Sequence, residues 1–179
     1  MMRIGVLLAS CVLISAGTSA AGDGPETIAI ENDVLRLEIQ TAPGPCVSQL
    51  VHKTSGQALV RGAVQCSLFS LDLVNAEGAV ETIDSARAGT STASVDRTGQ
   101  GCIVTITCTD FPGADLSAVV TVVSDTQDPL MRWSLRVDSD PQRRVQAVRF
   151  PQLRGVPAID AGEDDCLVLP ALPGTLIQN

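Results

Sequence analysis

The sequence predicts an all-β protein built as an antiparallel β-sandwich, and two observations carry this prediction. Apolar residues alternate with polar ones along short segments, for example over residues 35–39, 104–107 and 131–138. Turn-forming residues separate such segments at intervals of about 10 to 15 residues, as over residues 98–101. No window shows the periodicity of an amphipathic helix, so strands are expected throughout residues 28–150.

The composition fits one folded domain. The chain has 179 residues, of which 45% are hydrophobic, and this is enough apolar surface for a packed core. Its formal net charge is −8, which argues against nucleic acid as a partner because no basic stripe could replace the counterions of a phosphate backbone. Aromatic residues are few, with no tyrosine at all; they are Phe69, Phe111, Trp133 and Phe150.

Residues 1–21 have the pattern of a secretory signal peptide. Arg3 provides a positive charge, residues 4–14 form an apolar stretch, and small residues follow at a candidate cleavage site after Ala20 or Ala21. A lipoprotein box ending at Cys11 is the alternative, but the apolar stretch continues beyond that cysteine. The stretch is too short to span a bilayer, so we expect a secreted or periplasmic protein with no membrane span.

The expected sandwich covers residues 22–150, and the remaining residues have a different character. Residues 151–179 are rich in proline and glycine, and we expect them to lead out of the sandwich. The chain ends within two residues of Ile177, close to several apolar side chains. This pattern predicts a domain that is truncated at its C-terminal end.

Five cysteines follow the expected signal peptide, so at least one has no partner within the chain. Cys102 and Cys108 lie on the same side of one expected strand, about 20 Å apart, which excludes a bond between them. Cys46 and Cys66 form the favoured pair, because both flank expected turns. Buried free thiols remain the alternative for several of the five, Cys166 included.

No complete set of catalytic residues is recognisable. His52 is the single histidine, and it is interpreted as a surface residue at the end of a strand because no nucleophile accompanies it. The sequence predicts no cofactor; Ca²⁺ is considered only at the acidic cluster Glu163, Asp164 and Asp165, and a solvated turn is the favoured interpretation there. Trp133 shares its side of a strand with apolar residues, so we expect it in the core rather than on a sugar-binding platform.

Two pairs of motifs resemble a known family. Residues 31–38 and 47–56 resemble the first two strands of galactose-mutarotase-like β-sandwich domains, and residues 148–155 and 163–170 resemble the segments that follow such sandwiches. The resemblance implies a supersandwich fold at the N-terminus of a large secreted bacterial glycoside hydrolase. In such proteins a (β/α)-barrel carries the catalytic residues, and none of those residues corresponds to a position in this chain.

The expected function is therefore that of a structural or accessory sandwich within a secreted carbohydrate-active enzyme. Its partners would be a C-terminal catalytic domain, absent from this chain, and carbohydrate bound by the parent enzyme. A stand-alone secreted or surface-attached module of immunoglobulin type, acting in binding or adhesion, is the alternative. A complete small enzyme is the least favoured hypothesis, although two opposed carboxylates would suffice for glycoside hydrolysis.

Overall fold

The computed structural model describes residues 27–42, 44–62, 66–156, 166–169 and 175–178. Within these ranges the chain forms strands, one short 3-10 turn and no α-helix. The elements are β1 Thr27–Glu31, β2 Leu35–Gln40, β3 Cys46–His52, β4 Gln57–Arg61, β5 Ser70–Val74, β6 Val80–Asp84, η1 Ser85–Arg87, β7 Thr90–Thr98, β8 Gly101–Thr109, β9 Leu116–Asp125, β10 Met131–Ser139, β11 Arg144–Arg149, β12 Cys166–Leu169 and β13 Thr175–Gln178. The described residues include no helix of the length and apolarity needed to cross a membrane.

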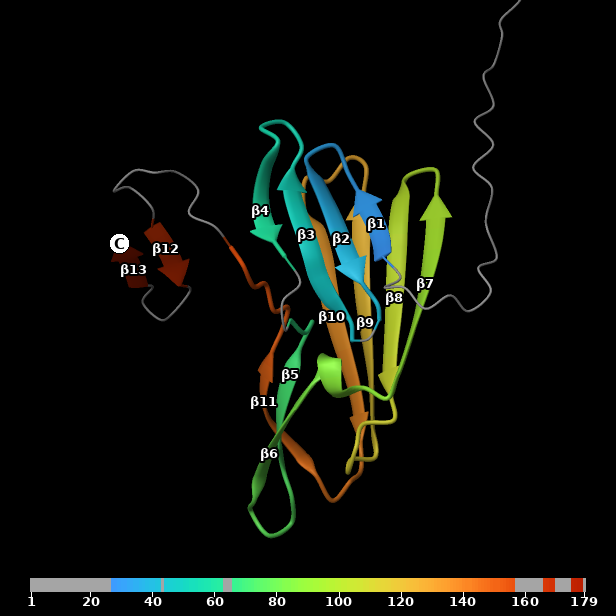
Figure 1. Ribbon diagram of the computed structural model, residues 1–179, viewed down its shortest axis with the longest axis vertical. Helices are drawn as coiled ribbons and strands as arrows, with labels where there is room; N and C mark the ends of the chain where they lie inside the picture. Colours follow the sequence, from blue (N-terminus) through green and yellow to red (C-terminus); the bar gives the residue numbers. More distant parts are fainter. Residues whose placement is uncertain (1–26, 43, 63–65, 157–165, 170–174, 179) are drawn as a thin grey trace, which may run out of the picture.

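The strands form antiparallel sheets, as predicted, and two of them face each other (Figure 1). One has the order β1-β2-β3-β4 and lies in front of the other, β10-β9-β8-β7, in Figure 1. A smaller sheet, β11-β5-β6, continues the front layer downwards, and β12 pairs with β13 as a separate hairpin. The expected all-β sandwich is confirmed.

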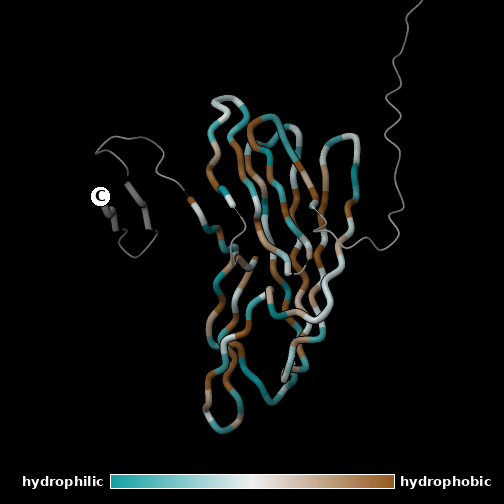
Figure 2. The backbone as a smooth tube through the Cα atoms, in the orientation of Figure 1, coloured by the Kyte–Doolittle hydropathy of each residue, from teal (hydrophilic) through white to brown (hydrophobic). Residues whose placement is uncertain are grey.

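Alternation along the strands produces the core (Figure 2). Val104 and Ile106 of β8 and Val120 and Val122 of β9 are completely buried, whereas Thr105, between the first two, points to the outer side of the sheet. The facing layer contributes Leu37, and the smaller sheet contributes the buried side chains of β5 and β6. Successive side chains of a strand point to opposite faces, so each sheet buries one face in the shared core.

The predicted pairing of cysteines is confirmed where the structure describes them. Cys46 and Cys66 form a disulfide that joins the start of β3 to the segment before β5, with 5.5 Å between their Cα atoms. Cys102 and Cys108 are both buried in β8 and are free thiols. Burial raises the pKa of each of these two thiols, so both remain protonated and unreactive at neutral pH.

The prediction for Trp133 needs correction. Its side chain faces the core, as expected, but it is only partly buried. The reason is its position on β10, the last strand of its sheet, beyond which no described strand follows. The sequence pattern identifies the face on which a side chain lies, but it does not identify an edge strand, and this is why the degree of burial was overestimated.

Candidate functional site

The sandwich is open along one side, where the edge strands β10 and β11 run. Apolar side chains of β10 face inwards yet stay only partly buried, and Val148 of β11 is 52% exposed. Leu130, at the start of β10, is 64% exposed. We call this side the open flank; it consists of Leu130, Met131, Trp133, Leu135, Val137, Val145, Val148 and Leu153.

The upper part of the open flank is hollowed into an apolar groove. The groove has a volume of about 180 Å³ and lies between β10 and the facing sheet. Trp133 lines it, and its ring lies edge-on to that of Phe150 with 6.2 Å between the ring centroids. The other lining residues are Leu35, Leu37, Leu50, Leu130, Met131, Pro151 and Leu153.

The segment after β11 forms one wall of this groove and is held in place by polar contacts. The backbone N–H of Gln152 donates to the carbonyl oxygen of Leu68, 2.9 Å away. The side-chain amide of Gln152 donates to Ser70 and accepts a hydrogen bond from the hydroxyl of Ser67, which is 2.7 Å away. The carbonyl oxygen of Gly155 accepts a hydrogen bond from the backbone N–H of Arg61. These hydrogen bonds hold this wall of the groove in place.

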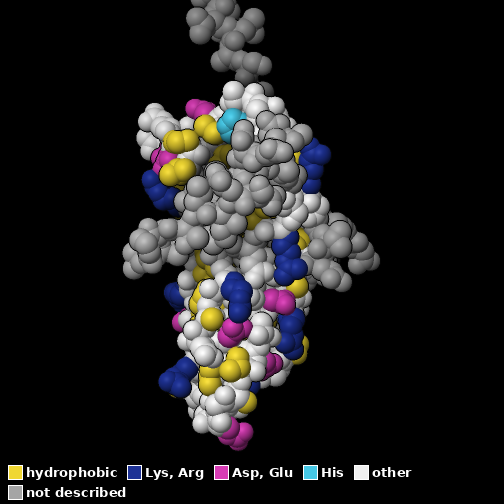
Figure 3. Space-filling model, turned by 90° about the vertical axis from the view of Figure 1, so that its left-hand side faces the viewer, with side chains coloured by type: hydrophobic (Ala, Val, Ile, Leu, Met, Phe, Trp, Pro, Cys, Tyr) yellow, Lys and Arg dark blue, Asp and Glu magenta, His cyan; other side chains and the backbone are white. Residues whose placement is uncertain are grey.

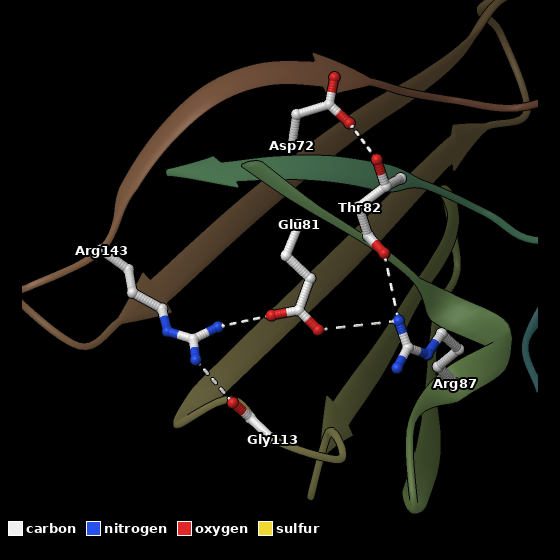
Figure 4. A network of polar contacts seen from close by, with 6 residues as sticks. All are labelled: Asp72, Glu81, Thr82, Arg87, Gly113 and Arg143. Carbon is white, nitrogen blue, oxygen red and sulfur yellow. Dashed lines mark hydrogen bonds and ion pairs between the residues drawn. The ribbon is translucent and has the colours of Figure 1, made fainter. Parts of the chain in front are cut away.

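A network of charged residues fixes the smaller sheet against the rest of the sandwich (Figure 4). Glu81 of β6 accepts a hydrogen bond from Arg143 at 2.9 Å and lies 3.9 Å from Arg87. Arg143 also donates to the carbonyl oxygen of Gly113, in the turn between β8 and β9. Since Arg143 lies between β10 and β11, this network ties the connection between these two strands to β6 and to the β8–β9 turn.

At the lower end of the sandwich, four aspartates surround a polar depression. It has a volume of about 430 Å³ and is built from the turns that follow β8 and β10 and the residues before β9. The acidic lining residues are Asp110, Asp115, Asp138 and Asp140. Among the described residues no group of histidine, cysteine, aspartate and glutamate side chains has the arrangement of a metal site. The sequence pattern gave no signal for this depression, because the aspartates come from separate turns.

The remaining predicted residues do not assemble into a site. His52 ends β3, as expected, and its Nδ1 lies 2.8 Å from the hydroxyl oxygen of Ser55 in the adjoining turn. That hydroxyl also accepts the backbone N–H of Gln57, so the contact organises the turn. The calcium candidates Glu163, Asp164 and Asp165 lie outside the described residues, as do Cys11 and the expected signal peptide.

Comparisons with protein families, with curated proteins and with solved structures found no match for this chain. The interpretation of the site therefore depends on its geometry, in which the open flank holds half of the large apolar side chains that are exposed among the described residues; these are Leu130, Val145, Val148 and Leu153. Figure 3 shows this side of the molecule, where hydrophobic side chains gather above and below the undescribed residues drawn in grey.

Proposed function

We propose that this chain is the accessory β-sandwich of a secreted carbohydrate-active enzyme of glycoside hydrolase type, and that it acts by packing against a catalytic domain. The galactose-mutarotase-like motifs of the sequence support this proposal, and the all-β sandwich is the architecture that those motifs imply. The role is mechanical: a rigid sandwich positions a neighbouring catalytic domain and forms one wall of its substrate cleft.

The open flank carries the proposal. A free-standing domain rarely leaves a continuous set of large apolar side chains in contact with water, and such surfaces mark places where another part of the protein packs. Here the flank also borders residues 150–156, through which the chain leaves the sandwich. A domain joined to that segment would therefore begin beside the surface that needs covering.

Export is supported by the same features that predicted it. The first 21 residues have the organisation of a signal peptide, and the Cys46–Cys66 disulfide is a type of bond that persists in oxidising compartments. A secreted or periplasmic location is therefore part of the proposal, and it agrees with action on an extracellular polysaccharide.

The proposal is tested on the longest coding sequence that contains this chain. We expect an in-frame (β/α)-barrel domain downstream of Asn179, and activity of the complete product on a panel of polysaccharides and aryl glycosides. Val148→Asp should reduce that activity, whereas Val95→Asp, which changes a valine that is 39% exposed on β7 at the opposite edge of its sheet, should not. A stop codon directly after Asn179 in a finished genome would contradict the proposal.

A binding module is the second candidate, and one observation favours it. On the outer side of the β7–β10 sheet, four hydroxyl side chains lie in register across the strands; they are Ser94, Thr105, Thr121 and Ser134. Such a row could donate to and accept from the hydroxyl groups of a glycan. Glycan-array binding by the isolated chain, lost in Thr105→Val with Thr121→Val, would support this candidate over the accessory role.

A further inference from the structure

We infer that the β12–β13 hairpin covers the upper part of the open flank by adding to the free edge of β10, so that its apolar residues close the groove beside Trp133. This inference deepens the proposed function, because it names the first segment of the parent protein that packs on the flank. It concerns contacts within this chain alone, and it can therefore fail or succeed independently of any catalytic domain.

The first argument is the backbone of β10. β10 is the last strand of its sheet, so among the described residues its outer N–H and C=O groups have no neighbouring strand. The strand is long, from Met131 to Ser139, and its inner side chains are apolar. An exposed edge of this kind is a template for another strand, which would gain both hydrogen bonds and apolar contacts.

The second argument is the hairpin itself. In the described part of the chain, β12 pairs with β13 and with no other strand. A two-stranded hairpin is at best marginally stable in water unless it packs on something else. Most of its strand residues are apolar in sequence, and the apolar ones are Cys166, Leu167, Val168, Leu169, Leu176 and Ile177. A hairpin of two short strands has too few residues to bury such a set of side chains by itself, whereas the open flank offers an apolar surface against which they could pack.

The length of the chain between the sandwich and the hairpin, and the length of the hairpin strands, are compatible with this placement. Residues 157–165 join the described end of the sandwich at Val156 to Cys166, and these ten residue steps can span at most about 35 Å. Val156 is itself part of the segment that borders the groove. A strand of four residues is about 13 Å long, which covers less than half of β10. The hairpin would thus cover the groove and leave the lower flank, at Val145 and Val148, for a following domain.

The single tryptophan of the chain is the natural reporter. In the full chain we expect Trp133 to give a blue-shifted emission and to be weakly quenched by acrylamide, because the hairpin excludes water from the groove. Leu167→Asp and Ile177→Asp, which change two residues paired across the hairpin, should shift the emission to the red and raise the quenching constant about twofold. Val80→Asp, the same type of change on another sheet, should leave both unchanged.

Amide exchange provides a second measurement that needs no variant. In the wild-type chain, the N–H groups on the outer edge of the part of β10 beside the groove should exchange slowly, and Leu130→Asp in the groove should accelerate exchange both there and in the hairpin. Fast exchange along that edge in the wild-type chain would overturn the inference. So would a Trp133 quenching constant that is high in the wild-type chain and unchanged by Leu167→Asp. Protection of Trp133 that grows with protein concentration would show that a second copy covers the flank instead.

Discussion

The centre of the sandwich and its open flank differ in how completely their apolar side chains are buried. In the centre of the sheet, Val120 of β9 is fully buried between its neighbours, whereas Val148 of β11 on the open flank is 52% exposed. Both residues are valines in antiparallel strands, but Val120 lies in a central strand with a neighbour on each side, whereas Val148 lies in an edge strand with one neighbour. The difference comes from the number of neighbouring strands: the interior of the sandwich is closed on all sides, whereas the open flank is not.

The largest effect should come from breaking the closed interior. Phe69 is completely buried and packs against Phe111, with 6.4 Å between the ring centroids, so Phe69→Ala should lower the free energy of unfolding by about 3–5 kcal/mol. Phe150→Ala, the same change at a ring that packs on Trp133 of the open flank, should cost less than half of that because water already reaches part of the Phe150 ring. Urea unfolding followed by circular dichroism gives both values. Equal losses of unfolding free energy in the two variants would contradict the distinction between the core and the open flank.

The closed region was largely predictable from the sequence. Alternation over residues 104–107 identified the strand that became β8, and it placed Cys102 and Cys108 on the same face. These predictions succeed because side chains of a central strand have only two environments, core and solvent. For such a strand, apolar–polar alternation with a period of two predicts which side chains are buried.

Edge features were not predictable in the same way. The sequence gives little signal for β7, Thr90–Thr98, because most of its side chains are exposed on both faces and few of them are apolar. The polar depression near Asp110 and the groove beside Trp133 are each formed by segments that are far apart in the sequence. A local sequence pattern does not show which distant segments lie next to one another. The candidate site therefore came from the structure, while most of the fold came from the sequence.

The disulfide should give the next largest effect. The Cys46–Cys66 bond closes a loop with a sequence separation of 20, for which chain-entropy arguments give about 3 kcal/mol of stabilisation. The double change Cys46→Ala with Cys66→Ala should lower the melting temperature of the oxidised chain to that of the reduced wild-type chain. Cys108→Ala is the control, because that thiol is free, and the variant should keep its sensitivity to reductant. A melting temperature that does not respond to reductant in the wild-type chain would refute this prediction.

A buried asparagine should give a smaller but measurable loss. Asn32 is 3% exposed; its side-chain oxygen accepts from the backbone N–H groups of Val34 and Leu35, and its amide donates to the carbonyl oxygen of Asp128. It thereby joins the β1–β2 turn to the turn before β10. Asn32→Ala leaves these groups without partners, and we expect a loss of about 1–3 kcal/mol in chemical unfolding. Asn75→Ala removes a comparable but exposed turn contact and should cost clearly less.

The smallest expected effect is a pH dependence of the stability that the contact between the edge strand β11 and β5 contributes. Arg149 of β11 donates two hydrogen bonds to Asp72 of β5, at 3.1 and 2.9 Å, and these bonds hold the pKa of the Asp72 carboxyl below its ordinary value. Thr82 donates a further hydrogen bond to the same carboxylate and acts in the same direction. Because the unfolded chain takes up this proton more readily, the contribution to stability is fully present above about pH 4 and is lost as the pH falls through the lowered pKa.

The matched measurement is a cycle of Asp72→Asn, Arg149→Met and the double variant, each unfolded in urea between neutral pH and acid. Asp72→Asn should lower the stability at neutral pH and reduce its decline in acid, and in its background Arg149→Met should have no further pH-dependent effect. The pair lies on the solvent side of the smaller sheet, so salt should weaken the effect as it screens the two charges. If the decline in acid were identical in all four proteins, the pair would not couple β11 to β5. The edge strand would then be held by its backbone hydrogen bonds and by the network around Glu81 and Arg143.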